Sequence, residues 1–248
     1  MMITNSTCNM VRSLDERKWR RREGAFKAEG SKCVLDTLAH FSVRALYATD
    51  EWIAAHDTCG TDAQPATRGE LRKMSSLVTP PEVIAVYDIP VRDLDPEAAR
   101  RGLVLALDTI QDPGNLGTII RVADWFGITD IICSRETADC YSPKVIQATM
   151  GAISRVRVHY CDLPATIAML GAPAVYGTFL DGDDIGTATL GDIGIIVTGN
   201  EGNGISPEVE AVVTHRLLIP SYPRGRQTSE SLNAAIATAI TLAKFRNV

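Results

Sequence analysis

The sequence predicts an α/β protein: a parallel-sheet domain in the C-terminal part, preceded by a small α/β domain. Two observations support this. From residue 103 onward, apolar runs of strand length alternate with segments of helical periodicity, and these runs are apolar at nearly every position. Strands buried on both faces have this pattern, which is typical of parallel sheets covered by helices. With 248 residues, the chain can also bury a sizeable core.

Short helices and strands alternate in the first part of the chain. The periodicity predicts strands at Ala25–Ala28, Arg44–Ala48 and Val83–Asp88, and helices at Leu14–Arg22, Gly30–His40, Asp50–His56 and Gly69–Ser75. The polar segment Val91–Arg101, with Pro90 before it and Pro96 inside it, is typical of a linker. We therefore predict a small α/β domain at residues 1–95 and a larger domain at residues 101–248.

The larger domain contains the regular strand and helix alternation. Strands are predicted at Leu103–Asp108, Thr129–Cys133, Arg155–His159, Ala174–Thr178, Gly194–Thr198 and Arg216–Ile219. Helices are predicted from about Asn115 and at Pro143–Met150, Leu163–Leu170, Pro207–Val213 and Glu230–Arg246. Ligands of such sheets bind in loops beyond the carboxyl ends of the strands, so functional residues are expected there.

Composition excludes several classes of protein. The hydrophobic and charged shares, 45% and 22%, are those of a globular protein. Apolar runs stay far below the roughly 18 residues of a membrane span, and the opening MMITNSTCNM lacks the apolar stretch of a signal peptide. The six cysteines form no CxxC pair and the four histidines are scattered, which favours reduced thiols and no metal site. We expect a cytoplasmic protein without a membrane partner.

Charge is distributed unevenly. The net charge of −5 argues mildly against a nucleic-acid partner. However, the segment Arg12–Lys32 holds eight basic and four acidic residues, so it carries +4 and the rest of the chain carries −9. A basic segment on an acidic body can bind phosphates locally, although a solvated helix face explains the run equally well.

Three segments at the predicted carboxyl ends of strands have an unusual composition. They are DPGNLGTIIR (Asp112–Arg121), GNEGNGIS (Gly199–Ser206) and LIPSYPRGRQTSESLN (Leu218–Asn233). Taken singly, each has an ordinary explanation: Asn115, Ser229 and Ser231 as helix caps, and Arg121 as a surface charge. The glycine spacing in the second is GxxGxG, which differs from the dinucleotide fingerprint GxGxxG, and no P-loop lysine follows.

Together, these segments resemble the three signature motifs of the SpoU–TrmH family of RNA 2'-O-ribose methyltransferases. The first motif corresponds to Asn115, Gly117 and Arg121, the second to Gly199, Glu201, Gly202 and Gly204, and the third to Ile219–Pro220 and Ser231–Leu232–Asn233. The segment Ser142–Val156 is similar to the family's PK…MGA stretch. The resemblance covers about residues 101–248, and the first half resembles, more weakly, a small ribosomal-protein-like substrate-binding domain. The chain departs from the family pattern in a longer loop, Ser221–Glu230, and in Ala-Ala after Asn233.

The resemblance implies a trefoil knot in the C-terminal domain, S-adenosylmethionine as the cofactor, and a homodimer in which Arg121 comes from the neighbouring subunit. It implies a cofactor pocket near Thr178, Gly199, Gly202, Ile219 and Leu232, and catalytic roles for Asn115, Arg121, Glu201, Ser231 and Asn233. Arg121 has two open roles, because an arginine keeps its proton at ordinary pH. It either loses a proton transiently or anchors the phosphate next to the target ribose.

The partner that the resemblance implies is structured RNA, and the extra N-terminal domain favours ribosomal RNA over transfer RNA. We expect RNA contacts at Arg20, Arg21, Arg22, Lys27, Arg224 and Arg226. Two alternatives stay open: a knotted RNA-binding module without turnover, and a nucleotide-dependent oxidoreductase suggested by the glycine-rich loop.

Overall fold

The structure is a computed structural model that describes residues 3–223 and 231–248. Its contacts divide the chain into two compact units. The first runs to Val91 and also takes in Asp139–Ser154, and the second consists of Arg92–Ala138 and Arg155–Val248. The segment Asp139–Ser154, which the sequence places inside the C-terminal domain, thus packs with the N-terminal unit.

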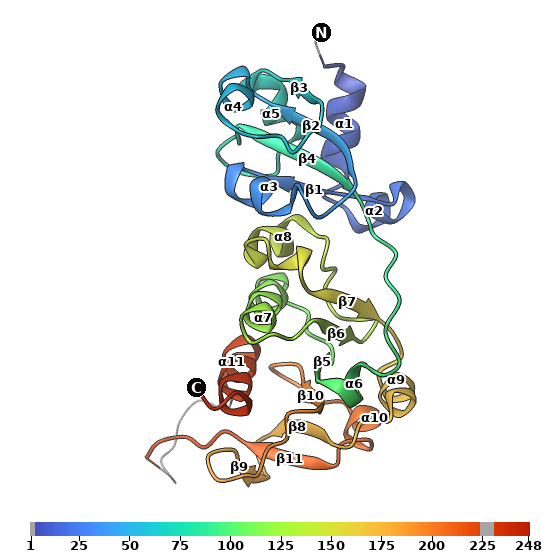
Figure 1. The fold of residues 1–248 in the computed structure, drawn as a ribbon, viewed down its shortest axis with the longest axis vertical. Coiled ribbons are helices and arrows are strands. Elements are labelled where there is room, and N and C mark those ends of the chain that lie inside the picture. Colours follow the sequence, from blue (N-terminus) through green and yellow to red (C-terminus); the bar gives the residue numbers. More distant parts are fainter. Residues whose placement is uncertain (1–2, 224–230) are drawn as a thin grey trace. The chain divides into compact units, whose positions relative to one another are not determined.

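The first unit contains a mixed four-stranded sheet with the order β1-β4-β2-β3 (Figure 1). Its strands are β1 (Ala25–Glu29), β2 (Val43–Ala48), β3 (Ala63–Pro65) and β4 (Val83–Asp88), and its helices are α1 (Asn5–Ser13), α2 (Arg17–Glu23), α3 (Ser31–Thr37), α4 (Asp50–Ala55), α5 (Arg68–Met74), α8 (Pro143–Thr149) and the 3-10 helix η1 (Ala152–Ser154). The sequence did not predict α1 or β3. Helix α1 is polar apart from a few residues such as Cys8 and Val11, which it buries while packing against α5.

The segment Asp139–Ser154, which contains α8, packs against the rest of the first unit through polar and aromatic contacts. The Gln147 side chain donates a hydrogen bond to the Glu29 carbonyl at 2.6 Å, and the Tyr141 and Phe26 rings lie 4.7 Å apart. Arg20 donates through Nε and Nη2 to the Asp139 carboxylate, at 3.0 and 2.6 Å. The basic helix α2 and the segment 139–154 are therefore fixed to the same small sheet.

The second unit is a seven-stranded sheet with the order β7-β6-β5-β10-β8-β11-β9, in which every pairing is parallel. Its strands are β5 (Leu103–Leu107), β6 (Asp130–Cys133), β7 (Arg157–Tyr160), β8 (Val175–Phe179), β9 (Asp183–Asp184), β10 (Gly194–Thr198) and β11 (His215–Leu218). Its helices are α6 (Ala98–Arg101), α7 (Pro113–Trp125), α9 (Leu163–Leu170), α10 (Pro207–Glu210) and α11 (Ala234–Phe245). The predicted parallel sheet is confirmed.

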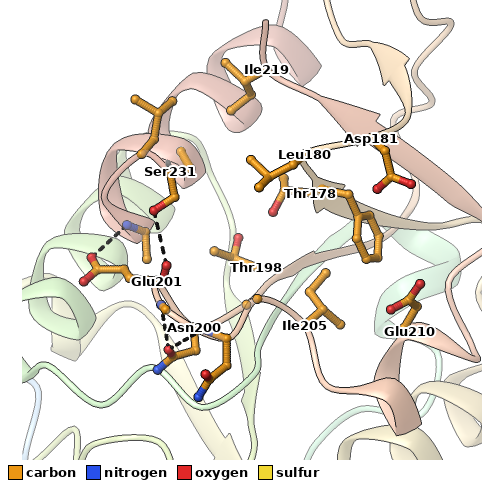
Figure 2. Close-up of a pocket in the computed structure, with 18 residues that line it drawn as sticks. Thr178, Leu180, Asp181, Thr198, Asn200, Glu201, Ile205, Glu210, Ile219 and Ser231 are labelled. Atoms are coloured by element: carbon orange, nitrogen blue, oxygen red, sulfur yellow. Dashed lines mark hydrogen bonds between the residues drawn. The ribbon is translucent and has the colours of Figure 1, made fainter. Parts of the chain in front are cut away.

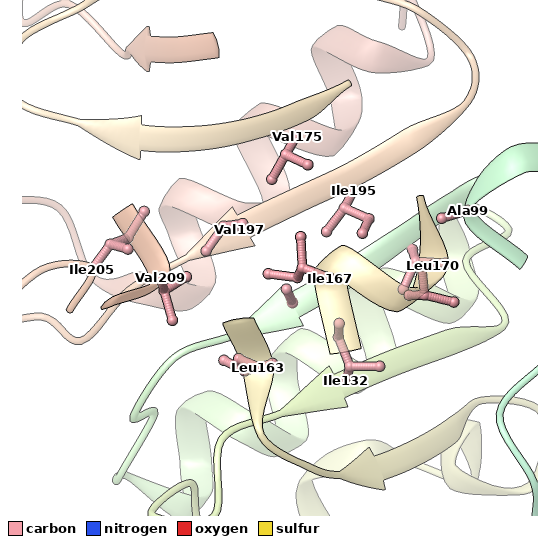
Figure 3. Close-up of a cluster of buried hydrophobic side chains, with 12 residues drawn as sticks. Ala99, Ile132, Leu163, Ile167, Leu170, Val175, Ile195, Val197, Ile205 and Val209 are labelled. Atoms are coloured by element: carbon pink, nitrogen blue, oxygen red, sulfur yellow. The ribbon is translucent and has the colours of Figure 1, made fainter. Parts of the chain in front are cut away.

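Helices cover both faces of this sheet. Side chains from α6, α9 and α10 pack against alternate residues of the central strands, such as Val104, Ile195 and Val197, in one buried cluster (Figure 3). Helices α7 and α11 pack against each other, and α11 also contacts β10. Because β5 and β10 are buried at every position, their sequences are almost entirely apolar.

Capping residues set the starts of the two helices beside the site. The Asp112 side chain accepts a hydrogen bond from the Asn115 N–H at 2.9 Å, and Pro113 occupies the first turn, so α7 begins two residues earlier than predicted. Helix α11 begins at Ala234, later than predicted. Its cap is Asn233, whose side-chain oxygen accepts from the Ala235 N–H at 3.0 Å, and Ser231 does not have this role.

Among the described residues, no helix combines the length and apolar character that crossing a bilayer requires. Over the same residues, no three metal-binding side chains of histidine, cysteine, aspartate or glutamate gather as a possible metal site.

Candidate active site

The three signature segments meet at one edge of the parallel sheet. They follow β5, β10 and β11, which together with β8 are consecutive strands of the sheet. Because all four strands are parallel, their carboxyl ends lie at the same edge, and residues far apart in sequence come within hydrogen-bonding distance.

Glu201 is the centre of a polar cluster that joins these segments. Its Oε1 accepts hydrogen bonds from Asn115 Nδ2 at 2.5 Å, Asn233 Nδ2 at 2.7 Å and the Ala234 N–H at 3.0 Å. Asn233 Nδ2 also donates to Asn115 Oδ1 at 2.9 Å, and Ser231 Oγ donates to the Glu201 carbonyl at 3.2 Å. We call Asn115, Glu201, Ser231 and Asn233 the Glu201 cluster. It contains four of the five residues for which the sequence predicts catalytic roles.

The cap of α7 positions Asn115 for this contact. Asp112 already satisfies the Asn115 backbone N–H, so the Asn115 side chain does not cap the helix and is directed to Glu201 instead. Asn233 both caps its helix and contacts the other motifs. Its Oδ1 caps α11, while its Nδ2 donates to Glu201 and Asn115. The explanation of Asn115 as a simple helix cap is therefore wrong.

A pocket of about 490 Å³ opens beside the Glu201 cluster. Its lining comes from the loops after β8, β10 and β11 and from the start of α11, and it includes all five residues predicted to bind cofactor: Thr178, Gly199, Gly202, Ile219 and Leu232. Figure 2 shows Glu201 and Ser231 at one end of the pocket and Asp181 and Glu210 at the other. The volume is typical of small-molecule sites.

Gly199 is required by the close approach of two parts of the glycine-rich loop. A Cβ at this position would overlap the backbone of Gly204 and the N–H of Ile205. Asn200 and Gly204 exchange backbone hydrogen bonds of 2.8 and 2.9 Å, which closes the loop into a tight turn. This turn leaves the pocket wall formed by backbone, as the glycine spacing predicts.

Comparisons with known proteins agree with this geometry. Residues 102–243 match the SpoU rRNA methylase family model. The chain belongs to this family. Residues 5–85 of the methylase match a second model, the MRM3-like substrate binding domain.

Relatives of this methylase cover nearly all of it. It is 29% identical over 240 residues to the Bacillus subtilis 23S rRNA (guanosine(2553)-2'-O)-methyltransferase RlmP, covering 95% of this chain and 94% of the relative. A putative TrmH-family RNA methyltransferase from Porphyromonas gingivalis is 39% identical, with a TM-score of 0.89 and full coverage of both chains. An AdoMet-bound rRNA methyltransferase from Sinorhizobium meliloti is 29% identical, with a TM-score of 0.85 and coverage of 100% and 96%.

The fifth predicted catalytic residue, Arg121, lies apart from the Glu201 cluster. It is on the exposed side of α7, and within residues 3–223 and 231–248 its side chain makes no hydrogen bond or ion pair. Arg121 is also not among the residues that line the pocket. Its predicted role stays a prediction.

The structure corrects two of the predicted RNA contacts. Arg20 is 3% exposed and donates to the Leu14 and Asp15 carbonyls as well as to Asp139. Lys27 is 1% exposed, and its ammonium lies 2.9 Å from carboxylate oxygens of Asp15 and Glu29. Their charges are already satisfied inside the first unit, so neither is available to RNA.

The other four predicted RNA contacts are not contradicted. Arg21 and Arg22 are exposed on α2. Arg224 and Arg226 lie outside the described residues.

Sequence reasoning missed Asn200, Asp108 and Thr109. Asn200 stands inside the glycine-rich motif and lines the pocket, but no role was predicted for it. Asp108 is buried at the end of β5, and its Oδ2 accepts the Ser206 N–H at 2.7 Å. The available signal was a carboxylate directly after a fully apolar strand, a place where a buried charge needs a partner.

Proposed function

We propose that the methylase transfers a methyl group from S-adenosylmethionine to the 2'-hydroxyl of a ribose in structured RNA, with ribosomal RNA preferred over transfer RNA. The observation that carries this is the Glu201 cluster, in which all three motifs meet beside a cofactor-sized pocket. RlmP is named for the same reaction on 23S rRNA, and the S. meliloti structure for its bound AdoMet. Transfer of labelled methyl groups to ribosomal RNA is the direct test.

The pocket fits S-adenosylmethionine in size and character. Its walls combine the backbone of Gly199 and Gly202 with the apolar side chains of Ile205, Ile219 and Leu232. Backbone groups next to apolar walls suit a flat adenine, while a bound sulfonium would supply an electrophilic methyl group. The residues that line the pocket would then hold the cofactor and exclude water from it.

The chain itself must align the ribose hydroxyl and remove its proton. The Glu201 cluster holds the Asn115 side chain in one orientation, so this amide is preorganised next to the pocket. Alignment of two reactants can supply a large part of a rate acceleration. We assign Asn115 to orienting the ribose or Arg121, and Glu201, Ser231 and Asn233 to holding the three segments together. Arg121 either takes the proton transiently or anchors the adjacent phosphate.

A second copy of the chain completes the proposed site. Trp125 on α7 is 84% exposed, and Ile236 and Ile240 on α11 are 51% and 39% exposed, although the two helices pack against each other. Exposed apolar side chains on adjoining helices mark protein interfaces, and a two-fold dimer would present Arg121 of one α7 to its partner. Sedimentation should give twice the 26.8 kDa chain mass, and Ile236→Asp should give monomers. A wild-type monomer at micromolar concentration would remove the proposal.

We further infer a trefoil knot. The strand order supports it, because β11 lies between β8 and β9, both of which precede it in the chain. Ser231, which follows β11 in the chain, donates a hydrogen bond to the Glu201 carbonyl in the glycine-rich loop.

The N-terminal domain, residues 1–95, is proposed to hold the RNA, and residues 101–248 to carry the chemistry. Helix α2 supports this: Arg20 fixes its inner side, while Lys18, Arg21 and Arg22 are exposed. Such a rigid basic surface suits phosphate contacts. A cytoplasmic location is part of this proposal, because the proposed RNA partner is expected there.

Reversing two charges tests this RNA surface. The double variant Arg21→Glu/Arg22→Glu should weaken RNA binding about 10-fold or more at moderate salt and flatten its salt dependence. Affinity for S-adenosylmethionine should stay unchanged. The matched control reverses a cation on another exposed surface, Arg100→Glu on α6. Equal RNA affinity of the double variant and the control in filter binding would refute the assignment of α2.

The alternative of an RNA-binding module without turnover has less support. The Glu201 cluster is complete, and a protein that only binds RNA does not need a preorganised amide beside a cofactor pocket.

A further inference from the structure

The turn after β5 holds a strained residue next to the cofactor pocket. Thr109 has a φ of 57°, in the left-handed region. A β-branched residue is a genuine outlier there, because its side chain crowds the backbone. Such strain persists where the surrounding structure enforces it, and it concentrates at functional sites.

Three hydrogen bonds hold Thr109 in this conformation. Its N–H donates to Ser134 Oγ at 2.9 Å, and its hydroxyl donates to Asp108 Oδ1 at 3.1 Å. Its carbonyl accepts from Asn200 Nδ2 at 2.8 Å. The last of these bonds reaches across to the glycine-rich loop.

Asn200 and Asp108 also fix the two ends of the glycine-rich loop. At its start, Asn200 Oδ1 accepts from the N–H groups of Gly202 and Asn203, at 2.9 and 3.1 Å. At its end, the buried Asp108 accepts the Ser206 N–H at 2.7 Å. The backbone of the loop is therefore held from the turn after β5, although residues 200 and 109 are 91 positions apart.

We propose that Asp108, Thr109 and Asn200 form a latch of positioning residues that keeps the glycine-rich loop in its cofactor-binding shape. The inference rests on the proposed cofactor pocket. The turn also leads directly into α7, so the latch ties the loop that lines the pocket to the helix that carries Asn115 and Arg121. In the left-handed conformation, the Thr109 carbonyl faces the loop and meets the Asn200 amide.

Asn200→Asp isolates the latch. Aspartate keeps an oxygen for the Gly202 and Asn203 N–H groups but loses the donor to the Thr109 carbonyl. We expect the Kd for S-adenosylhomocysteine to rise about 10-fold, the effect of losing one well-placed hydrogen bond. This product lacks the sulfonium charge, so attraction between the added carboxylate and a sulfonium does not enter the measurement. In methyl transfer, the KM for S-adenosylmethionine should rise while kcat at saturation changes less than KM does.

The matched control is Gln64→Glu, the same change from amide to carboxylate on an exposed strand of the first unit.

A second pair of variants, Asp108→Asn and Asp108→Ala, tests the other end of the loop. Asparagine retains an acceptor for the Ser206 N–H, so it should restore most of the affinity that alanine loses. An unchanged Kd in Asn200→Asp overturns the latch, and so does a fall in kcat with an unchanged KM. If Gly199→Ala also binds normally, the pocket assignment itself fails rather than the latch.

Discussion

Gly199→Ala is expected to weaken binding of S-adenosylmethionine about 10- to 100-fold, the range expected when an added methyl group must displace packed atoms. The new Cβ would overlap the backbone of Gly204 and Ile205, which cannot rotate away as a flexible side chain can. The loop would have to open, breaking the paired Asn200 and Gly204 hydrogen bonds and moving the pocket wall. Isothermal titration calorimetry measures the effect directly.

The control for this variant is Gly102→Ala, because a Cβ at Gly102 meets no atom within 4 Å and the residue lies outside the pocket lining. It should bind cofactor like the wild type. Normal affinity in Gly199→Ala would mean that the cofactor binds elsewhere.

Arg121→Ala is expected to lower kcat about 10²- to 10⁴-fold, the usual contribution of a group that assists proton transfer. The Kd for S-adenosylmethionine should change little, because Arg121 is exposed on α7 and does not line the pocket. Single-turnover methylation and calorimetry separate the two effects. Arg100→Ala, which removes an exposed arginine from α6, should keep normal turnover. Near-normal methylation by Arg121→Ala would show that the site is wrongly assigned.

Arg121→Lys then distinguishes the two roles of this residue. Lysine retains the positive charge, so a phosphate anchor should keep a substantial share of its rate with an unchanged pH profile. If Arg121 takes the proton, the lysine variant should instead acquire a rate that rises with pH, because an ammonium loses its proton more readily than a guanidinium.

Much of the second unit is predictable from its sequence, because strands such as β5 and β10 are short apolar runs followed by loops of glycine and polar residues. Order along the chain and parallel pairing place the residues after β5, β10 and β11 at one edge. This is why the Glu201 cluster was accessible to sequence reasoning, even though Asn115 and Asn233 are 118 residues apart. The motif resemblance then selected them from many other polar loop residues.

Other features depend on contacts that no local pattern reveals. Arg20 and Lys27 stand in a basic run that resembles a solvated helix face, yet the structure buries both. The partner of Arg20 is Asp139, 119 residues away, in a segment that joins the first unit although the sequence places it in the C-terminal domain. Burial raises the pKa of Glu29, but the Lys27 ammonium and hydrogen bonds from Ser75 and Ser76 outweigh it and leave that pKa below its ordinary value.

The left-handed conformation of Thr109 could not be predicted from the sequence either. Threonine favours extended backbone, and the left-handed conformation is stabilised by Asn200, Ser134 and Asp108, of which only Asp108 is a sequence neighbour. Strained positions of this kind break local rules, and they are where sequence reasoning is expected to fail at a functional site.

The central claim is that the methyl group goes to a ribose oxygen of RNA. Its most direct test is transfer from tritium-labelled S-adenosylmethionine to total RNA of a strain lacking this protein, followed by nucleoside analysis. The account predicts label in one 2'-O-methylated nucleoside of ribosomal RNA, with Arg121→Ala giving almost none. Label in a base-methylated nucleoside, or no transfer by a protein that binds the cofactor, would contradict it.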